Sequence, residues 1–481
     1  MATTTDQSSA PAAVTAATGT ITAGPALPLR TRVIYGFGDI ASQFIWTITS
    51  SFLAVFYTDM VGIAAGTVAV LILVARVFDA VIDPFIGALA ERTRSRFGRF
   101  RPWILYGMVP LSIMVVLTFT APFDGKSIGA VIWAVLTYGL LGALYSSVNV
   151  PYGALSTVMS ERTADRVSLN SWRMIGTNIG GVVLGVAILP IILAFSGGDG
   201  SHPTAQGYTI AAAVFAVAAL PLFFLVFATS KEVVKPVLRD RVPFSTTFRL
   251  VLGNGQLMLL FVVLLLSLTS LFGRLSVVLF YYLNNVGNYA LVSLLMALAP
   301  LSTVVGILVF SRLGRRFGKR NMLMISFAAQ AVVLTALFLT GWEDIGVVIG
   351  LTALYGLSSY GIPLVLAMVS DAIDYAEDKT GIRTDGTSYA LTSLATKIAS
   401  AVGGAVGIAL LGAIGYVASA HQQPAEVLHG INLVVNIGPA IAAALAIVPL
   451  LFYRISEARY AEIRERLDTK ALAAIKLQQE G

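Results

Sequence analysis

The segment LVARVFDAVIDPFIGALAERTRSRFGRFRPW, residues 73–103, combines an apolar run with internal charges and a strongly basic loop. With the apolar residues before it, the run is long enough for a helix that crosses a bilayer, which needs about 20 residues. Arg76, Asp79 and Asp83 nevertheless lie within it. A charge at the bilayer centre costs roughly 2.5–3.5 kcal/mol even on the mildest scale, so these three residues indicate pairing or a functional site.

The composition of the whole chain is that of a membrane protein. Of its 481 residues, 57% are hydrophobic and only 12% are charged, whereas a soluble protein carries about 25% charged residues. Similar apolar runs recur throughout, which predicts an all-α polytopic membrane protein with about twelve transmembrane helices. The predicted spans are residues 33–58, 64–90, 102–121, 128–157, 167–195, 208–228, 256–284, 289–311, 322–341, 346–375, 386–417 and 430–453.

The positions of the Lys and Arg residues predict the orientation. If the N-terminus is cytoplasmic, 27 of the 32 cations fall on the cytoplasmic side and one falls outside. This asymmetry is typical of membrane proteins, and an even number of spans places both termini inside. We therefore expect a multi-pass protein of the cytoplasmic (inner) membrane. The net charge of +7 then reflects basic loops rather than nucleic-acid binding.

An internal repeat indicates two halves. RFGRFRPWIL at 96–105 follows the second predicted span, and RFGKRNMLMI at 316–325 follows the eighth. Two parallel six-helix halves are typical of the major facilitator fold. The predicted organisation is a disordered cytoplasmic tail (1–29), an N-terminal six-helix bundle (30–228), a cytoplasmic middle loop (229–255), a C-terminal six-helix bundle (256–453) and a cytoplasmic tail (454–481) that includes an amphipathic helix.

The acid pair of the second span is the predicted cation site. Asp79 lies three residues after Arg76 and four before Asp83, so all three share one helix face. Two carboxylates on one face suit Na⁺, which prefers oxygen ligands, or could carry H⁺ by sharing a proton. Ser146 and Asn149 of the fourth span are candidate neutral ligands. The alternative is a structural ion pair between Arg76 and Asp79, which leaves Asp83 unexplained.

Polar residues on other spans predict a substrate site. Asp39, Gln43, Trp46 and Ser50 follow one another at helical spacing in the first span. Hydrogen-bonding groups beside an aromatic ring suit a polyhydroxylated ligand, although helix packing explains the stripe equally well. The fourth span adds Asn149 and Tyr152 around Pro151, the fifth adds Arg173, and the eleventh adds Lys397. Arg173 and Lys397 could bind a substrate, balance the charges of Asp79 and Asp83, or do both.

Further charges are expected to serve gating or charge balance. They are Arg76, Asp39, Arg274 in the seventh span, and Asp371 and Asp374 at the end of the tenth. Arg274 either lines the same cavity from the second half or has another role. For Asp371 and Asp374, gate ion pairs with loop arginines are expected.

These residues together predict a secondary active transporter that works by alternating access. The chain has no cysteine, and its three histidines, His202, His421 and His429, fall in short connections, so no enzyme site is expected. No cofactor is expected other than the coupling cation, and one chain is expected to act as a monomer. The alternative function is a cation-coupled or uncoupled carrier of lysolipids or drugs on the same fold.

The chain resembles the glycoside–pentoside–hexuronide:cation symporters, the melibiose-carrier branch of the major facilitator superfamily. The resemblance covers about residues 33–453 and is carried by YGFGD, FYTD, the opening segment, NVPYGAL, MVSDAIDYAEDKTGIRTDG and ATKIASAVGG. It implies symport of a sugar, glycoside or hexuronide with Na⁺, H⁺ or Li⁺. Acids matching Asp79 and Asp83 serve the cation in this family, and positions matching Arg173 and Lys397 lie at or beside the sugar site.

Three positions depart from the melibiose-carrier pattern. Gln43 and Asn149 stand where that carrier has acids, and Gly153 stands where it has a tryptophan. The predicted site has fewer negative charges and more room, so the substrate is expected to differ from melibiose. The retained Arg173 and Lys397 favour an anionic substrate such as a hexuronide, with neutral pentosides and disaccharides equally compatible.

Overall fold

A computed structural model describes residues 26–125, 127–160, 162–197, 202–233, 244–381, 385–417 and 422–480. These residues contain twelve helical segments long and apolar enough to cross a membrane, and no β-strand. The predicted spans are therefore confirmed, with their ends shifted by a few residues. The predicted disorder of the N-terminal tail concerns residues that lie almost entirely outside the described ranges.

The first half of the bundle contains six spans. They are α1 (Leu29–Thr47) continued by η1 (Ile48–Phe52), α2 (Leu53–Val55) and η2 (Phe56–Val61), then α3 (Ala65–Arg92), α4 (Arg101–Thr118), α5 (Ile128–Val158), α6 (Thr163–Ala194) and α7 (Ala205–Thr229). The segment joining the halves includes α8 (Phe244–Gly253), a helix that the sequence did not predict.

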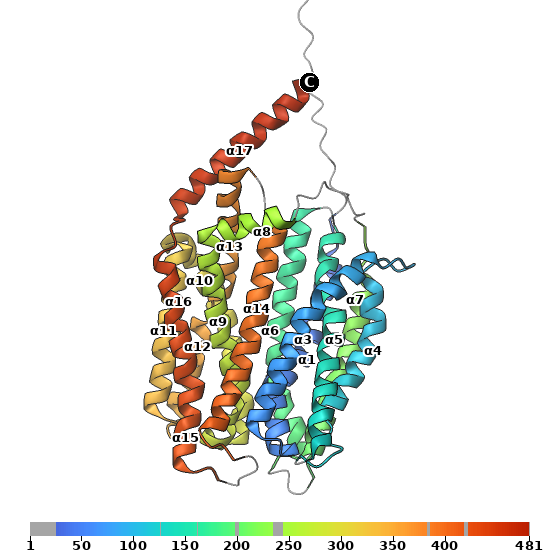
Figure 1. Cartoon of the computed structure of the whole chain (residues 1–481), viewed down its shortest axis with the longest axis vertical. Coiled ribbons are helices and arrows are strands. Elements are labelled where there is room, and N and C mark those ends of the chain that lie inside the picture. The colour runs from blue at the N-terminus through green and yellow to red at the C-terminus, as the bar shows by residue number, and fades with distance from the viewer. Residues whose placement is uncertain are drawn as a thin grey trace, which may run out of the picture.

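The second half repeats this arrangement. It contains α9 (Gly255–Phe280) with η3 (Tyr281–Val286), α10 (Tyr289–Phe317), α11 (Lys319–Thr340), α12 (Ile345–Ser358) with α13 (Gly361–Thr380), α14 (Asp385–Ala413), and α15 (Ala425–Asn432) with η4 (Leu433–Ile437) and α16 (Gly438–Leu451). The predicted helix in the C-terminal tail is α17 (Glu457–Glu480), which projects beyond the bundle (Figure 1).

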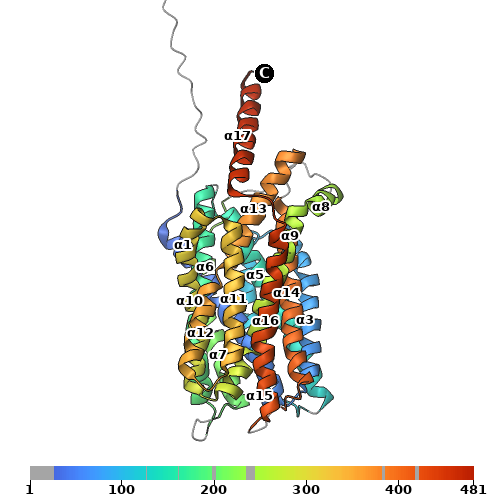
Figure 2. The same cartoon turned by 90° about the vertical axis from the view of Figure 1, so that its left-hand side faces the viewer.

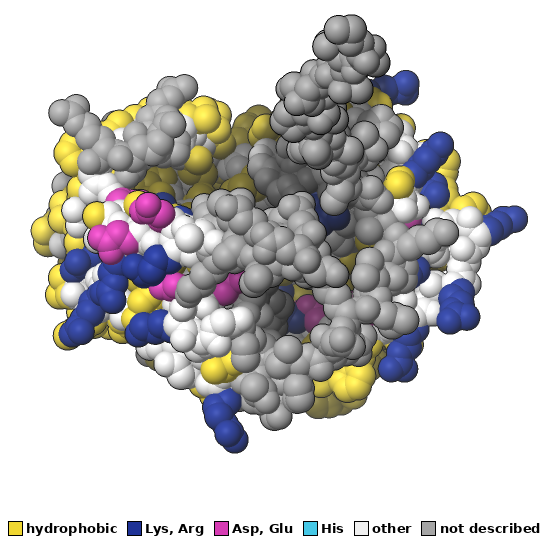
Figure 3. All heavy atoms as spheres, turned by 90° about the horizontal axis from the view of Figure 1, so that it is seen from above, with side chains coloured by type: hydrophobic (Ala, Val, Ile, Leu, Met, Phe, Trp, Pro, Cys, Tyr) yellow, Lys and Arg dark blue, Asp and Glu magenta, His cyan; other side chains and the backbone are white. Residues whose placement is uncertain are grey.

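The two halves lie side by side and touch along two helix pairs. Helix α3 packs along α14, and α6 packs along α10 (Figure 2). Helices α8 and α17 lie at one end of the bundle, which we call the basic end, and α15 lies at the other, which we call the far end. Figure 3 views the basic end, where Lys and Arg side chains are spread around the rim.

The basic-end loops confirm the sequence repeat. Gly98 and Gly318 hold equivalent places and both have positive φ, 104° and 81°, which favours glycine. Glu232, just after α7, accepts hydrogen bonds from three backbone N–H groups at the start of α4, at 2.8–3.2 Å. Glu457, just after α16, accepts one from Lys319 N at 3.1 Å. A carboxylate at a helix N-terminus satisfies free N–H groups and the helix dipole, so the same device begins the third helix of each half.

The spans at the far end also repeat. FYTDMVG at 56–62 and YYLNNVG at 281–287 each form a π-helical turn that ends at a glycine with positive φ. Asp59 from the first of these turns accepts hydrogen bonds from the Tyr416 hydroxyl of the second half, at 2.9 and 3.0 Å. A Cβ added at Gly412 would lie 3.6 Å from the Ala65 Cβ, so α14 and α3 also meet closely here. The halves are thus joined at the far end.

Candidate functional site

Three ion pairs lie where the polar residues of the spans gather. Arg173 Nε lies 2.8 Å from Asp39 Oδ2, and Arg76 Nη1 lies 3.8 Å from Asp79 Oδ2. Lys397 Nζ pairs with Asp83 Oδ2. Three acids therefore face three bases, and this cluster is electrically balanced.

The acid pair retains free oxygen atoms. Asp79 Oδ1 and Asp83 Oδ1 are both buried, and neither has a hydrogen-bond partner among the described residues. A buried acceptor without a partner is costly, so these two atoms are candidates for binding a cation or a proton. No group of three acidic or histidine side chains in the described ranges could hold a metal ion. A Na⁺ here would need neutral oxygens in addition to the two carboxylates.

Helix α5 is the element that faces the acid pair. A Cβ at Gly142 would overlap the Asp79 carboxylate, so glycine leaves the space that the carboxylate occupies. Ser146 is one turn further along α5 and is buried. The contacts of Gly142 with Asp79 and of Val150 with Gly87 place Ser146 at the level of Asp83, and its role as a cation ligand stays a prediction. Asn149 Nδ2 donates to the Tyr145 hydroxyl at 2.7 Å.

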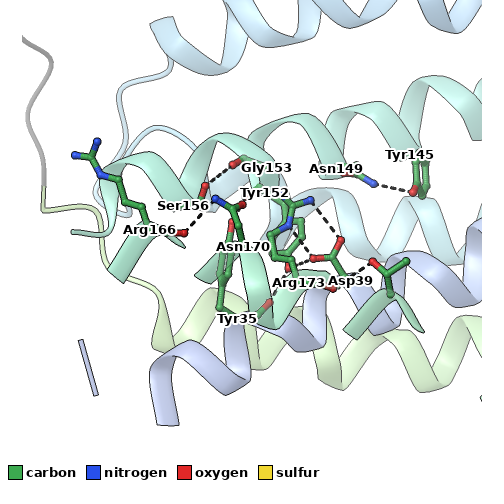
Figure 4. Close-up of polar contacts among 11 residues, drawn as sticks. Tyr35, Asp39, Tyr145, Asn149, Tyr152, Gly153, Ser156, Arg166, Asn170 and Arg173 are labelled. Atoms are coloured by element: carbon green, nitrogen blue, oxygen red, sulfur yellow. Dashed lines mark hydrogen bonds and ion pairs between the residues drawn. The ribbon is translucent and has the colours of Figure 1, made fainter. Parts of the chain in front are cut away.

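The Asp39–Arg173 pair of this cluster lies between α1, α5 and α6 (Figure 4). The Tyr152 hydroxyl lies 2.7 Å from Asp39 Oδ2, and the Arg173 guanidinium lies 4.7 Å from the centre of the Tyr152 ring. The Tyr35 hydroxyl donates to the Tyr152 carbonyl at 2.5 Å. Tyr152 is fully buried and holds Asp39 and Arg173 in place, so the geometry does not support the predicted substrate contact of Tyr152.

The other predicted substrate residues lie closer to the space between the halves. Trp46 is half-buried and its ring contacts those of Tyr145 and Phe272, at 5.8 and 6.2 Å between centroids. The Arg76 guanidinium lies 4.3 Å from the centre of the Trp46 ring. Gln43 is half-buried and donates to Thr47 Oγ1 at 2.8 Å. At Gly153 an added Cβ would lie 3.6 Å from Arg173 Nη1, so this glycine leaves room beside the guanidinium.

The predicted gate acids form ion pairs within the second half. Asp371 Oδ2 lies 2.6 Å from Lys319 Nζ, and Asp374 Oδ2 lies 3.6 Å from Arg464 Nη1 of α17. Asp374 also accepts from the Tyr460 hydroxyl at 2.9 Å. These pairs tie α13 to α11 and α17, and the partner of Asp371 is a lysine rather than a loop arginine. Arg383, an arginine of the loop after α13, lies outside the described residues.

Arg274 lies apart from the three ion pairs. It is 4% exposed on α9, and Nη1 donates to Val435 O at 3.1 Å and to Asn436 Oδ1 at 2.6 Å. It lines a cavity of the second half, of about 260 Å³, to which Asn178 of α6 also contributes. The sequence left open whether Arg274 lines the cavity of the three ion pairs or has another role, and the structure places it in this separate cavity.

Sequence reasoning missed several residues that shape the site. They are Tyr35, Tyr138, Gly142, Tyr145 and Asn178. Gly142 and Tyr145 sit on the same α5 face as Ser146 and Asn149, at spacings of three and four, and helical periodicity could have found them. Tyr35 and Asn178 carried no such signal.

Comparisons with known proteins show the family of the chain. The chain matches the family described as MFS/sugar transport protein over residues 34–457. It is 33% identical over 442 residues to "Putative glycoside/cation symporter YagG" of Escherichia coli (strain K12), covering 92% of this chain and 95% of that protein. It is 31% identical to "Glucuronide carrier protein homolog" of the same organism, over 92% and 96% of the two chains.

A solved structure supports the fold. A protein from a study of substrate recognition in proton-dependent oligopeptide transporters matches with a TM-score of 0.64, 13% identity, and coverage of 91% of this chain and 100% of that one. The resemblance to the glycoside–pentoside–hexuronide symporters is thus confirmed, and the protein is a multi-pass membrane transporter rather than an enzyme. The chain belongs to the MFS/sugar transport protein family of the major facilitator superfamily.

Proposed function

We propose that this protein moves a sugar or glycoside together with a monovalent cation, Na⁺ or H⁺, by alternating access. The observation that carries the proposal is the pairing of Asp83 on α3 with Lys397 on α14, beside two carboxylate oxygens that have no partner. The acid pair of one half is thereby linked to a base of the other half. The similarity to a protein named as a glycoside/cation symporter supports the same function.

The cation step follows from competition for the acids. A cation at Asp79 Oδ1 and Asp83 Oδ1, with Ser146 as a neutral ligand, would offset the negative charge that holds Lys397. Lys397 would then be released from Asp83. Because a base in the low-dielectric interior needs a partner, Lys397 becomes available to hydroxyl groups of a substrate.

The sugar step uses the residues that border the same space. The Trp46 ring offers an aromatic face for the C–H groups of a sugar, and Gln43 and Asn149 offer amide groups for its hydroxyls. Lys397 contributes once the cation has bound, while Arg173 remains paired with Asp39. Each ligand then raises the affinity for the other by the same factor.

The two ends of the bundle suit an alternating mechanism. At the far end Tyr416 and Asp59 join the halves, whereas the ion pairs of Asp371 and Asp374 at the basic end lie within the second half. We propose that this conformation is closed at the far end, that the basic end is cytoplasmic, and that a single chain contains the complete transport path.

Uptake into vesicles tests this function. Purified protein is reconstituted and screened with labelled β-D-glucosides, β-D-xylosides and β-D-glucuronides, with and without an imposed Na⁺ or pH gradient. We expect one gradient to drive accumulation, Asp83→Asn to abolish it, and exchange of labelled for unlabelled substrate to survive in that variant. Asp344→Asn is the matched control, because Asp344 only caps α12 and asparagine caps equally well. Uptake that ignores every gradient and the Asp83 substitution would contradict the proposal.

A further inference from the structure

Arg274 is a buried cation that no carboxylate balances among the described residues. Its contacts are the Val435 carbonyl, the Asn436 side-chain oxygen, and the Tyr355 ring, whose centre lies 4.7 Å from the guanidinium. All three groups are neutral. Arg76, Arg173 and Lys397 are by contrast each paired with an acid. In this conformation Arg173 and Lys397 are thus neutralised by their acids, whereas the charge of Arg274 is available to an anionic ligand.

The surroundings of Arg274 form a cavity that could hold part of a ligand. The cavity of about 260 Å³ lies between α9, α10, α11, α12 and α13, and Asn178 closes it from α6. Its wall is mostly apolar, with Ser267, Thr303 and Gln330 as additional polar groups. Apolar walls with a few fixed polar groups are typical of small-molecule sites.

The charge of Arg274 is not needed for its hydrogen bonds. Nη1 alone makes the hydrogen bonds that tie α9 to η4, and a neutral amide donor could make the same bonds. An ionised side chain at membrane depth is costly and marks a ligand pathway more often than a packing contact. A guanidinium also matches the planar, two-oxygen geometry of a carboxylate, which a neutral donor does not.

The cavity lies next to the proposed sugar site. Leu275, one residue after Arg274, borders this cavity and also a small space lined by Ser50 and Arg76. Phe272, on the same helix, contacts the Trp46 ring. A substrate whose sugar ring lies against Trp46 could therefore place its other end in the Arg274 cavity.

We propose that the Arg274 cavity is a subsite for a carboxylate at the end of the substrate remote from the sugar ring. The proposal rests on the proposed function, since it assigns one end of the same glycoside. The anion-binding group is then Arg274 on α9, and neither Arg173 nor Lys397. The bound substrate would then contact both halves, at Trp46 in the first and at Arg274 in the second.

Competition by matched ligands tests the subsite. The probes are 4-carboxyphenyl and 4-carbamoylphenyl β-D-glucosides and β-D-xylosides, which differ in charge but hardly in size. Each competes with uptake of the labelled glycoside that the wild-type vesicles transport. We expect the carboxylate to compete about tenfold better than the amide in the wild type, because it adds a charge-assisted bidentate pair. In Arg274→Gln the two probes should compete equally, with the amide changed less than about threefold.

Two further variants separate charge from packing. Arg274→Lys keeps the charge but not the two-pronged geometry, so the carboxylate preference should fall to about threefold. Ser270→Ala removes another hydrogen bond from α9 to the α16 segment, at 2.8 Å to Pro439 O, without changing charge, and should keep the full preference.

The outcomes are distinct. Two results in Arg274→Gln would overturn the subsite and assign Arg274 to helix packing. One is an unchanged preference for the carboxylate probe, and the other is an equal loss of competition by the carboxylate and amide probes. If Arg274→Gln does not fold, the carboxylate preference of the wild type and of Arg274→Lys still tests the subsite. A wild type in which the carboxylate and amide probes compete equally also overturns the subsite. Wild-type vesicles that transport no glycoside would overturn the proposed function as well, whereas glycoside transport without a carboxylate preference overturns the subsite alone.

Discussion

At Gly142 the backbone of α5 leaves the space in which the Asp79 carboxylate lies. The side chain of any other residue would push Asp79 away from its present position. A single missing methyl group thus determines whether α5 can approach the acid pair. The proposed cation site depends on this approach, because Ser146 follows Gly142 by one helical turn.

Gly142→Ala is therefore expected to weaken cation coupling without unfolding the protein. The added methyl group displaces Asp79, and we expect the apparent affinity for the coupling cation to fall at least about tenfold, or roughly 1.4 kcal/mol. Cation titration of uptake in vesicles measures it. Gly139→Ala is the matched control, since a Cβ there would meet no atom within 4 Å and the titration should be unchanged. Equal titrations for both variants would remove α5 from the cation site.

The Asp39, Tyr152 and Arg173 cluster leads to a prediction on stability. Asp39→Asn leaves the Arg173 charge buried without its acid, and we expect a loss of about 3–5 kcal/mol in the free energy of unfolding. Tyr152→Phe removes the hydroxyl that donates to Asp39 Oδ2 and the Tyr35 carbonyl but keeps the ring beneath Arg173, so the expected loss is about 1 kcal/mol. Thermal unfolding in detergent compares them. Equal losses in the two variants would show that the ion pair is not the dominant contact of this cluster.

At the scale of elements, the π-helical turns η2 and η3 end the first helix of each half at the far end. Gly62 and Gly287 stop these turns with φ of 89° and 65°. An L-residue in this left-handed region is strained, by roughly 1–2 kcal/mol. The repeated turn places Asp59 where Tyr416 of the second half can reach it.

Gly62→Ala and Gly287→Ala should each lower the free energy of unfolding by about 1–2 kcal/mol through the backbone alone. A Cβ at either position would meet no atom within 4 Å, so steric contact is not the cause. Gly66→Ala is the control, because Gly66 has equal space but helical φ, and it should be neutral or slightly stabilising. Equal melting temperatures for all three variants would show that the positive φ is not the cause of the loss in the free energy of unfolding.

The elements also show which features the sequence could predict. The twelve spans were predictable because each depends on a local apolar run, and the acid pair was predictable because i, i+4 spacing fixes a shared face. The sequence offered charge balance of Asp79 and Asp83 as one role for Lys397, but it did not show that Lys397 pairs with Asp83, since these residues are 314 positions apart in the chain. The buried role of Tyr152 likewise depends on contacts with α1 and α6 that local sequence does not encode.

The middle of the tenth span was predicted as one helix but is broken between α12 and α13. Pro363 lies in the first turn of α13, and proline cannot continue a helix from the residues before it. The free carbonyl of Ser358 instead accepts from Ser326 Oγ at 2.6 Å. The proline was visible in the sequence, but the neighbouring helix that satisfies the carbonyl was not.

For the whole molecule, the proposed alternating access requires the halves to separate at the far end. The chain contains no cysteine, so a pair introduced as Ala65→Cys and Gly412→Cys would be the only thiols. The Cβ atoms would lie 3.6 Å apart, within the range of about 3.5–4.5 Å that a disulfide requires. Oxidation should stop transport in vesicles, and reduction should restore it.

The single variant Ala65→Cys is the control for this cross-link and should transport equally under both conditions. Quantified loss of free thiol reports how completely the bond has formed. Transport at the wild-type rate by the fully oxidised double variant would show that α3 and α14 do not separate at the far end.

In the proposed mechanism the acid pair links the cation to the sugar. Equilibrium binding of the labelled glycoside to purified protein, with and without saturating cation, tests this link in the wild type and in Asp83→Asn. We expect the cation to raise wild-type sugar affinity at least about fivefold, and Asp83→Asn to bind sugar with an affinity independent of the cation. Sugar affinity that responds to the cation equally in both proteins would show that the acid pair does not link the two ligands.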